Sequence, residues 1–368
     1  MTAKRMVSAA VECLPAYQPG RSIEEVSRDF GVAEVIKLAS NENPFGPSPK
    51  AVEAMAKALT TVARYPDDGA LALRTELATR HGVEPGQVVL GAGGTDLIEL
   101  AVRTFTTPAD HAVVSSGSFV AYRLFLMSNS VPFTEVPLRG DAIDLPGIAA
   151  AVRPETRLIF LPNPNNPTGT VFTKGELADF LASIPDTVLV VLDDAYADYC
   201  DPEDDLPDTL EVLRRRPLTL VLRSFSKAYG LAGMRLGYGV SMPEVVTYLQ
   251  KVRRPFAVNR LAIEGGRAAL GDTAHLERTL RLTKLGRAYL FRELAALGYR
   301  PVKSHANFVM ADLGSEDAVG TLCRSLLERG LIVRPLAAFG LPGGVRFTVG
   351  TERENEALVA TLRALKGT

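Results

Sequence analysis

The run Val188-Leu189-Val190-Val191-Leu192 is apolar throughout, and it constrains the fold more than any other stretch. A strand that is apolar on both faces is typical of a parallel strand with helices on both sides of its sheet. Shorter β-prone runs recur along the chain, with helical patterns between them. The strands expected in this part of the chain are 88–90, 112–115, 158–161, 188–192 and 218–222. The sequence therefore predicts an α/β protein with a large three-layer αβα domain and a mainly parallel sheet.

The C-terminal part follows a different order of elements. We expect a long amphipathic helix over 273–297, which joins two domains, because apolar residues gather on one face and charges on the other. After it we expect a strand at 308–311, a helix at 316–328, strands at 332–335 and 345–349, and a helix from 352 to 365. The predicted domains are an N-terminal arm (1–48), a large domain (49–270) and a smaller α/β domain (271–368) that includes part of the arm.

Composition excludes several classes of partner. With 41 basic and 42 acidic residues the net charge is −1, so nothing indicates nucleic acid or an acidic membrane surface. Three widely spaced cysteines form no metal-ligand pair, so we predict no metal, and their odd number does not suggest a disulfide framework. No signal peptide is visible and no apolar run is long enough to span a bilayer. We expect a cytoplasmic protein.

Ser224-Phe225-Ser226-Lys227 follows the strand expected at 218–222 and leads into a glycine-rich turn with Arg235. A lone lysine after a strand is usually an exposed surface residue. An amine placed where water is scarce and beside a cation, however, loses its proton more readily and becomes a nucleophile. Schiff-base chemistry with pyridoxal phosphate needs such an amine. The span 224–239 resembles the cofactor-lysine segment of class I/II aminotransferases, which are fold-type I pyridoxal-phosphate enzymes.

This resemblance implies that Lys227 binds the cofactor pyridoxal 5'-phosphate and is the catalytic residue. It also implies that Ser224, Ser226 and Arg235 bind the cofactor phosphate. A second anion site is expected at Gly91-Ala92-Gly93-Gly94-Thr95, between strand 88–90 and a helix over 96–105, because free N–H groups at a helix N-terminus favour phosphate. Glycines in such a turn also serve tight packing. Similarity to the phosphate-binding turn of the family assigns this role to Gly94, Thr95 and the backbone of Asp96.

Four further residues match family positions around the cofactor ring. Phe119 holds the ring-stacking position, although it could also be a core phenylalanine. Asn166, in a run that resembles the family's Asn-Pro-Thr-Gly motif, is expected to hydrogen-bond the phenolic oxygen. Asp193 ends an apolar strand, where ligands bind in open α/β sheets, and is expected to face the pyridine nitrogen. Tyr196 is expected to donate to the phenolic oxygen. A metal-binding pair of Asp193 and Asp194 is the alternative, but no histidine or further acid accompanies it.

The remaining expected site residues contact the substrate or reach the active site of a dimer partner. Arg346, inside a strand, resembles the substrate-carboxylate arginine of the family, and a buried guanidinium favours a planar anion, carboxylate or phosphate. The resemblance also implies substrate contacts from Arg334, Asn307, Asn43 and Tyr17. Asn43 lies in the run 40–47, which composition alone would leave as a surface loop. In the family, the tyrosine of Arg-Tyr-Pro reaches the partner subunit's cofactor phosphate, so Tyr65 implies a homodimer with shared active sites.

Within the family, the chain best resembles the histidinol-phosphate aminotransferases. The resemblance rests on the runs at 17–21, 41–44, 330–335 and 349–351. The expected reaction is a ping-pong transfer of the amino group of histidinol phosphate to 2-oxoglutarate, in histidine biosynthesis. The alternatives are a phenylalanine or tyrosine aminotransferase and a decarboxylase or lyase of the threonine-phosphate type. A non-catalytic cofactor-binding regulator is disfavoured because the lysine is present.

Overall fold

The computed structural model describes residues 7, 9–14 and 20–367. Its main feature is a seven-stranded sheet, and each strand of this sheet that the sequence predicts is present with slightly shifted ends. In spatial order the strands are β2 (Val88–Gly91), β8 (Gly237–Val240), β7 (Thr219–Ser224), β6 (Leu189–Asp193), β5 (Thr156–Pro162), β3 (His111–Ser115) and β4 (Phe133–Val136). Only β8 runs in the direction opposite to the other six strands. The expected mainly parallel sheet is therefore confirmed.

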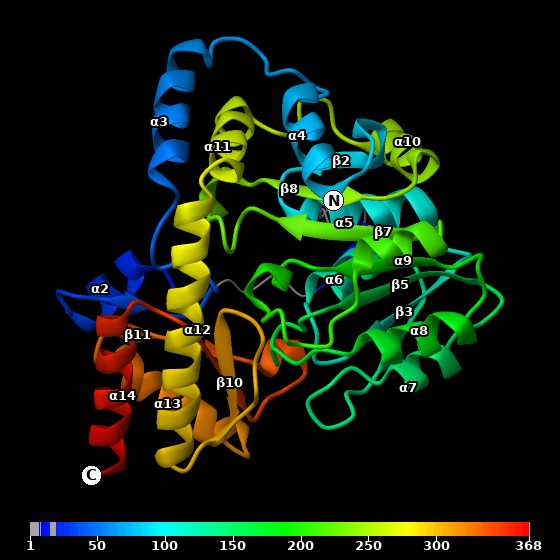
Figure 1. Cartoon of the computed structure of the whole chain (residues 1–368). Coiled ribbons are helices and arrows are strands. Elements are labelled where there is room, and N and C mark those ends of the chain that lie inside the picture. The colour runs from blue at the N-terminus through cyan, green and yellow to red at the C-terminus, as the bar shows by residue number, and fades with distance from the viewer. Residues whose placement is uncertain (1–6, 8, 15–19, 368) are drawn as a thin grey trace.

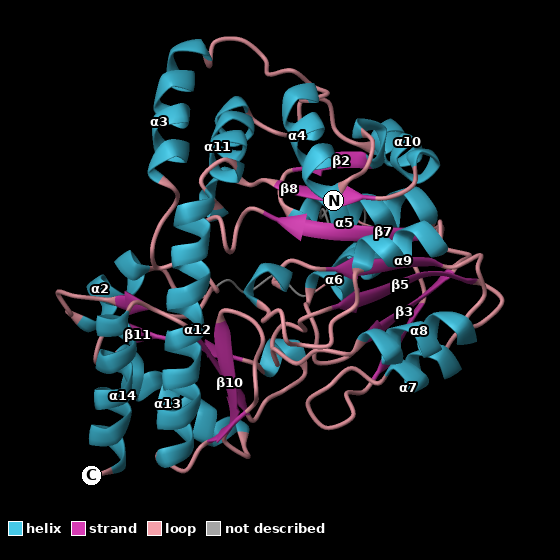
Figure 2. Cartoon of the chain, viewed as in Figure 1, coloured by secondary structure: helices cyan, strands magenta, loops and turns pink. Residues whose placement is uncertain are grey.

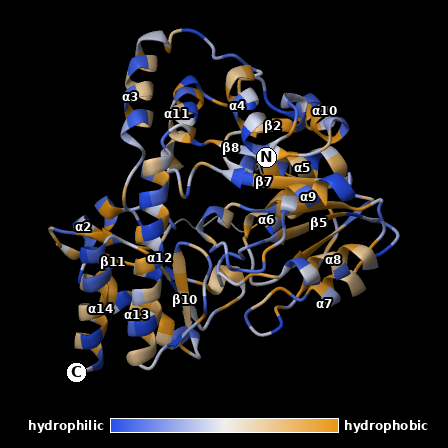
Figure 3. Ribbon diagram, in the orientation of Figure 1, coloured by the Kyte–Doolittle hydropathy of each residue, from blue (hydrophilic) through white to orange (hydrophobic). Residues whose placement is uncertain are grey.

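Helices cover both faces of this sheet, because successive side chains of its strands alternate between two apolar layers. Leu189 and Val191 of β6 pack into one core cluster, and Val190 and Leu192 pack into the other. The first face is covered by α5 (Gly94–Phe105), α6 (Ala121–Ser128) and α10 (Pro243–Val252). The second is covered by α4 (Leu71–His81), α7 (Leu145–Ala150), α8 (Lys174–Ser183), α9 (Thr209–Arg215) and α11 (Arg260–Leu270). Figure 3 shows the hydrophobic strands of this sheet between helices of mixed hydropathy.

A second, smaller sheet lies beyond the long helix α12 (Thr273–Ala296) (Figure 1). It is antiparallel and has the order β12 (Arg334–Pro335), β13 (Gly344–Thr348), β10 (Phe308–Asp312) and β9 (Arg300–Pro301). The helices α12, α13 (Glu316–Leu327) and α14 (Glu352–Lys366) share its apolar core. In Figure 2, β10 stands across the direction of β5 and β7, so the two sheets are separate layers.

The N-terminal arm is anchored to this smaller part. Helix α2 (Ile23–Phe30) begins at a capping box, in which Ser22 and Glu25 bond each other's backbone N–H. Strand β1 (Ile36–Lys37) then pairs in parallel with β11 (Leu331–Ile332). The prediction of one strand over 332–335 is therefore wrong. The chain changes sheet there, because Ile332 pairs with the arm whereas Arg334 pairs with Arg346 of β13.

The remaining helices connect the arm to the large sheet. The short helix α1 (Ala9–Glu12) lies within the arm, and α3 (Pro49–Ala58), which Ser48 caps, packs against α11. Single 3₁₀ turns occur at Leu59–Thr61, Pro85–Gln87, Ala197–Tyr199, Ala232–Met234 and Ala337–Phe339. No helix of the described residues is both long and apolar enough to cross a membrane.

Candidate active site

A cavity of about 420 Å³ opens at the carboxyl ends of β5, β6 and β7, between the large sheet, the arm and strands β12 and β13. This is the edge where open α/β sheets bind ligands. The cavity brings together most of the predicted site residues. Those that line it are Gly94, Thr95, Phe119, Asn166, Asp193, Tyr196, Ser224, Ser226, Lys227, Arg235, Arg334 and Arg346.

One end of the cavity is built to hold an anion. Helix α5 begins at Gly94 rather than at the predicted residue 96, because Gly93 adopts a φ of 90° as its cap and leaves the first N–H groups free. A Cβ on Gly93 would lie 2.5 Å from Nη2 of Arg235, and one on Gly237 would lie 2.6 Å from the backbone nitrogen of Gly94. Only glycine allows this close approach of a helix N-terminus and a guanidinium.

Hydroxyl groups complete the donor set at this end. Nη1 of Arg235 lies 3.5 Å from Oγ of Ser226, and the Ser226 backbone N–H donates to Oγ of Ser224 at 3.0 Å. Thr95 follows Gly94 in the first turn of α5. Backbone N–H groups, hydroxyls and a guanidinium together match the chemistry of a phosphate group.

Asp193 places a buried carboxylate in the same cavity. Its Oδ1 accepts from the Ala195 N–H at 3.1 Å, and its Oδ2 accepts from the Tyr122 hydroxyl at 2.7 Å. Burial raises the pKa of Asp193, while the Tyr122 hydrogen bond and the nearby Lys227 act in the opposite direction. A carboxylate held in this way fits a protonated ring nitrogen.

Tyr122 itself is a site residue that the sequence analysis missed. Its ring stacks on Phe160 at 4.7 Å and meets the Phe119 ring edge-on at 5.7 Å, so packing fixes the hydroxyl against Asp193. Its position three residues after Phe119 could have indicated this role, but the helix that begins at Ala121 was not predicted from the sequence.

Lys227 lies in the loop that follows β7, next to the arm. Its Nζ donates to the Ser40 carbonyl at 3.2 Å and lies 5.6 Å from the centroid of the Tyr196 ring. The side chain is only half-buried, so the amine faces the cavity. Among the described residues that line the cavity it is the one lysine, and it can act there on a carbonyl group held against Asp193 and the anion-binding end.

Two arginines face each other on the wall formed by the small sheet. Arg334 of β12 and Arg346 of β13 are directly paired residues of antiparallel strands. Arg346 is 4% exposed, donates to the Ala39 carbonyl at 2.7 Å and to Oδ1 of Asn166, and lies 5.2 Å above the Phe308 ring. Like charges placed opposite each other on a sheet are unfavourable, so this wall suits an anionic ligand.

Four predicted site residues lie elsewhere, and a fifth is outside the described residues. The Asn43 side chain bonds the Ala228 carbonyl and the Phe45 N–H, and that of Asn307 bonds the Asn41 carbonyl. Neither asparagine lines the cavity. The Asp96 carboxylate accepts from the Ala92 N–H and does not line the cavity either. Instead Asn41, in the same predicted run as Asn43, lines the cavity. Tyr65 is 78% exposed, away from the cavity of its own chain, and Tyr17 lies outside the described residues.

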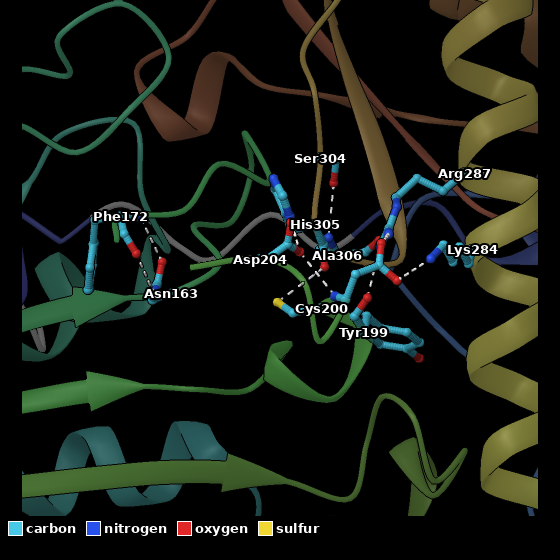
Figure 4. A network of polar contacts seen from close by, with 11 residues as sticks. Asn163, Phe172, Tyr199, Cys200, Asp204, Lys284, Arg287, Ser304, His305 and Ala306 are labelled. Atoms are coloured by element: carbon cyan, nitrogen blue, oxygen red, sulfur yellow. Dashed lines mark hydrogen bonds and ion pairs between the residues drawn. The ribbon is translucent and has the colours of Figure 1, made fainter. Parts of the chain in front are cut away.

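Polar contacts fasten the loop after β6 to the smaller part (Figure 4). Arg287 of α12 donates to the carbonyls of Tyr199 at 3.1 Å and Ala306 at 3.0 Å. Nδ1 of His305 lies 2.7 Å from Asp204, and the His305 N–H donates to the Gly169 carbonyl at 2.8 Å. The two halves of the cavity wall are therefore held together behind the site.

Asp194, the second acid of the predicted pair, belongs to the protein interior. Its Oδ2 accepts from the Thr209 hydroxyl at 2.7 Å and from Arg223 at 3.0 Å, and burial raises its pKa to about 6. It does not line the cavity. In the described part of the chain, no group of three or more His, Cys, Asp or Glu residues is arranged to hold a metal ion.

The fold, the lysine, the buried carboxylate and the anion-binding turn define a fold-type I pyridoxal-phosphate enzyme, and these residues fit pyridoxal 5'-phosphate as the cofactor. Residues 33–362 match the family model described as "Aminotransferase class I and II", and the chain belongs to this family.

Relatives support this assignment over the full length. The chain is 46% identical to a histidinol-phosphate aminotransferase of Anaeromyxobacter sp. over 98% of this chain and 99% of the relative. It is 42% identical to histidinol-phosphate aminotransferase 1 of Nitrosococcus oceani, over 98% and 97%. The solved histidinol-phosphate aminotransferase of Sinorhizobium meliloti, in complex with pyridoxal-5'-phosphate, superposes with a TM-score of 0.89 at 29% identity and covers 98% of both chains.

Proposed function

We propose that this chain is a histidinol-phosphate aminotransferase that transfers the amino group of histidinol phosphate to 2-oxoglutarate in histidine biosynthesis. The observation that carries the proposal is the pair Arg334 and Arg346, two cations directly opposite each other on the wall of the cavity that holds Lys227. The phosphate group of a substrate offers negative charge and several acceptor oxygens, which suit both guanidinium groups. The full-length similarity to enzymes with this name supports the same substrate.

Pyridoxal phosphate supplies an aldehyde that binds amines and a ring that withdraws electrons from the carbon next to the amine. In the proposed mechanism, Nζ of Lys227 would hold the cofactor by this aldehyde. The same Nζ would act as general base and acid toward the proton on the substrate carbon that bears nitrogen. Asp193 keeps the ring nitrogen protonated, which makes the ring a better electron acceptor.

The other proposed roles concern binding and orientation. Phe119 stacks on the ring, whereas Asn166 and Tyr196 bind its phenolic oxygen. The cofactor phosphate is bound by Gly94, Thr95, the backbone of Asp96, Ser224, Ser226 and Arg235. On the substrate side we retain Tyr17 as a proposed contact. Asn43 and Asn307 are proposed to act indirectly, because their amides tie the arm to Ala228 and Asn41.

We also propose a homodimer with shared active sites, in which Tyr65 binds the partner subunit's cofactor phosphate. Tyr65 is 78% exposed and stacks on Phe256, itself 42% exposed, at 4.5 Å. Leu59, Val62 and Leu71 nearby in the chain are also exposed. Exposed apolar side chains grouped in this way favour a protein contact.

The proposed domains remain the arm (1–48), the large domain (49–270) and the small domain (271–368). Free cysteines agree with the proposed cytoplasmic location.

Half-reactions of the purified, cofactor-loaded protein test this function. The protein should absorb near ~420 nm, as cofactor bound through a lysine does. Histidinol phosphate should convert this band into that of the aminated cofactor and yield the corresponding ketone, and 2-oxoglutarate should restore it. Faster conversion by phenylalanine or tyrosine would replace the proposal with an aromatic aminotransferase. Carbon dioxide released from threonine phosphate would replace it with a decarboxylase.

A further inference from the structure

Asn41 adopts an unusual conformation next to the active site. It is a non-glycine residue with a φ of 55°, in the left-handed region, and it is 1% exposed. Asparagine tolerates this region better than most residues, but such positions persist only where the surroundings enforce them. Here the surroundings are polar partners from both parts of the molecule, Thr348 and Asn307 on one side and Tyr196 on the other. The strained residue therefore connects the small sheet to the cavity.

The direction of each hydrogen bond around Asn41 can be assigned. The Asn41 backbone N–H donates to Oγ1 of Thr348 at 3.0 Å, so this hydroxyl oxygen acts as an acceptor there. The Thr348 hydroxyl proton then donates to Oδ1 of Asn41 at 3.1 Å. Because Oδ1 faces Thr348, the amide nitrogen faces the Tyr196 hydroxyl, 2.9 Å away. An amide nitrogen only donates.

It follows that the Tyr196 oxygen accepts from Asn41 and keeps its own proton for another acceptor. A tyrosine hydroxyl has a single proton, and both Tyr196 and Asn41 line the cavity. If the amide were turned around, its oxygen would accept the Tyr196 proton and withdraw it from the cavity. The Thr348 hydroxyl is the group that prevents this turn.

The position of Thr348 links this arrangement to substrate binding. Thr348 lies two residues after Arg346 on β13, so both side chains project from the same face of the strand. On the other side, the carbonyl of Ser40, next to Asn41, accepts from Nζ of Lys227 at 3.2 Å. The arm residues 40 and 41 therefore lie between the lysine and the strand that carries the anion-binding arginine.

We propose that Thr348 and Asn41 form a hydrogen-bond relay that directs the Tyr196 hydroxyl proton into the cavity, toward the phenolic oxygen of the cofactor. This rests on the proposed function, in which Tyr196 binds that oxygen. Thr348 and Asn41 are positioning residues, because they act through Tyr196. A donor held against the phenolic oxygen stabilises its anionic form and lowers the pH at which the bound cofactor loses its proton.

The groups that surround the Tyr196 hydroxyl must stay constant in any test. The titratable and charged side chains near it are Asp193 on the preceding strand, Tyr122 of α6, Tyr199 in the following turn, Lys227 after β7 and Arg346 of β13. Neutral substitutions at positions 41 and 348 alter none of these groups. A shift in titration is then attributable to the relay.

The test compares Thr348→Val, which removes the hydroxyl at nearly constant shape, with Thr348→Ser, which keeps it. The readout is the pH midpoint of the absorbance change of the bound cofactor near ~420 nm, a measurement on the resting protein that needs no turnover. Thr348→Val should raise the midpoint by about 0.5–1 pH unit, a three- to tenfold change in proton affinity. Thr348→Ser should leave it at the wild-type value.

Asn41→Gly is the second variant, because glycine retains the left-handed backbone and loses only the amide. It should raise the midpoint by a similar amount, and it keeps the test decisive if Thr348→Val does not fold. Tyr196→Phe sets the upper limit, and Thr348→Val should cause no further shift in its background.

The outcomes separate the relay from the function on which it rests. Wild-type protein that shows no band after reconstitution would refute the proposed function. A normal wild-type band, with a shift in Tyr196→Phe but none in Thr348→Val or Asn41→Gly, would refute the relay alone. An equal shift in Thr348→Ser would also refute it, because the hydroxyl would then not be the responsible group.

Discussion

The two sheets present their site residues in different ways. In the large sheet, Asp193 and Lys227 lie at or beyond the carboxyl ends of strands, and the strands themselves are apolar core. In the small sheet, Arg334 and Arg346 lie within paired strands, and their side chains reach the cavity by the alternation of the antiparallel sheet. The loops of one sheet and the strand faces of the other therefore meet in one cavity.

This difference suggests a division of labour. A residue at a strand end can change its position with the loop, whereas a side chain within a paired strand is fixed by register. We expect the strand ends of the large sheet to hold the cofactor and perform the chemistry with any substrate. The strand face of the small sheet should select the substrate by its anionic group. Variants in the two regions should then fail in different ways.

The largest effect is expected for Lys227→Ala. Loss of the amine should abolish the absorbance near ~420 nm and lower turnover of every amino donor by roughly 10³-fold or more. Spectra and single-turnover kinetics measure both effects. Lys251→Ala is the matched control, because Lys251 lies on α10 over the ring of the exposed Tyr248 and does not line the cavity. Turnover retained in Lys227→Ala would show that residues at the strand ends of the large sheet do not perform the chemistry.

Arg346→Gln should reduce kcat/KM for histidinol phosphate by about 10²-fold, since charge-assisted hydrogen bonds to the anion are lost. Arg334→Gln should cost about tenfold, because Arg334 is less buried than Arg346. The absorbance of the bound cofactor should persist in both variants. The value of kcat/KM for an amino donor without an anionic group should fall much less. Equal losses for charged and uncharged donors would contradict the assignment of substrate selection to the small sheet.

The fold was predictable to the extent that each element is locally encoded. The apolar runs at 158–161, 188–192 and 218–222 correspond to strands β5, β6 and β7 and are buried except for the half-buried Leu218, and the capping boxes at Ser22 and Thr173 begin helices. Strand β4 and helix α4 were not predicted. β4 is half-exposed at the edge of its sheet, and α4 has no side-chain cap and follows an alanine in the left-handed conformation. Their positions are set by tertiary contacts rather than by a local pattern.

The site was predictable where a motif is contiguous. Lys227, Asp193 and Asn166 lie in such motifs, and all three line the cavity. Tyr122 and Asn41 were missed because their roles depend on partners 71 and 155 residues away in the chain. No local pattern reveals which of two asparagines, Asn41 or Asn43, faces the cavity. That choice depends on the left-handed turn at Asn41.

The contact between the two regions can be tested at Arg287. Arg287 is 8% exposed, and its guanidinium donates to the carbonyls of Tyr199 and Ala306 (Figure 4). Arg287→Met should lower the free energy of unfolding by about 3 kcal/mol, because buried acceptors lose their donor. Lys284→Met, one turn earlier, removes an exposed ion pair with Asp201 and should cost under ~1 kcal/mol. Chemical denaturation of both variants measures the difference. Equal losses would indicate that the buried bonds do not hold the regions together.

The smallest expected effect is that of Tyr122→Phe, which tests how the large sheet controls its own carboxylate. Burial raises the pKa of Asp193, and the Tyr122 hydroxyl lowers it. Without the hydroxyl this pKa should rise, so Asp193 becomes protonated at a higher pH and binds the protonated ring nitrogen less well.

The cofactor dissociation constant of Tyr122→Phe should increase by about tenfold, and its increase at acid pH should begin at a higher pH than in the wild type. Tyr229→Phe is the control, since Tyr229 is buried against Phe225 and does not line the cavity. Equilibrium titration with the cofactor across pH measures both quantities. If affinity fell by the same factor at every pH, the Tyr122 hydroxyl would contribute to binding without controlling the charge of Asp193. The charge state of Asp193 would then not depend on the Tyr122 hydroxyl.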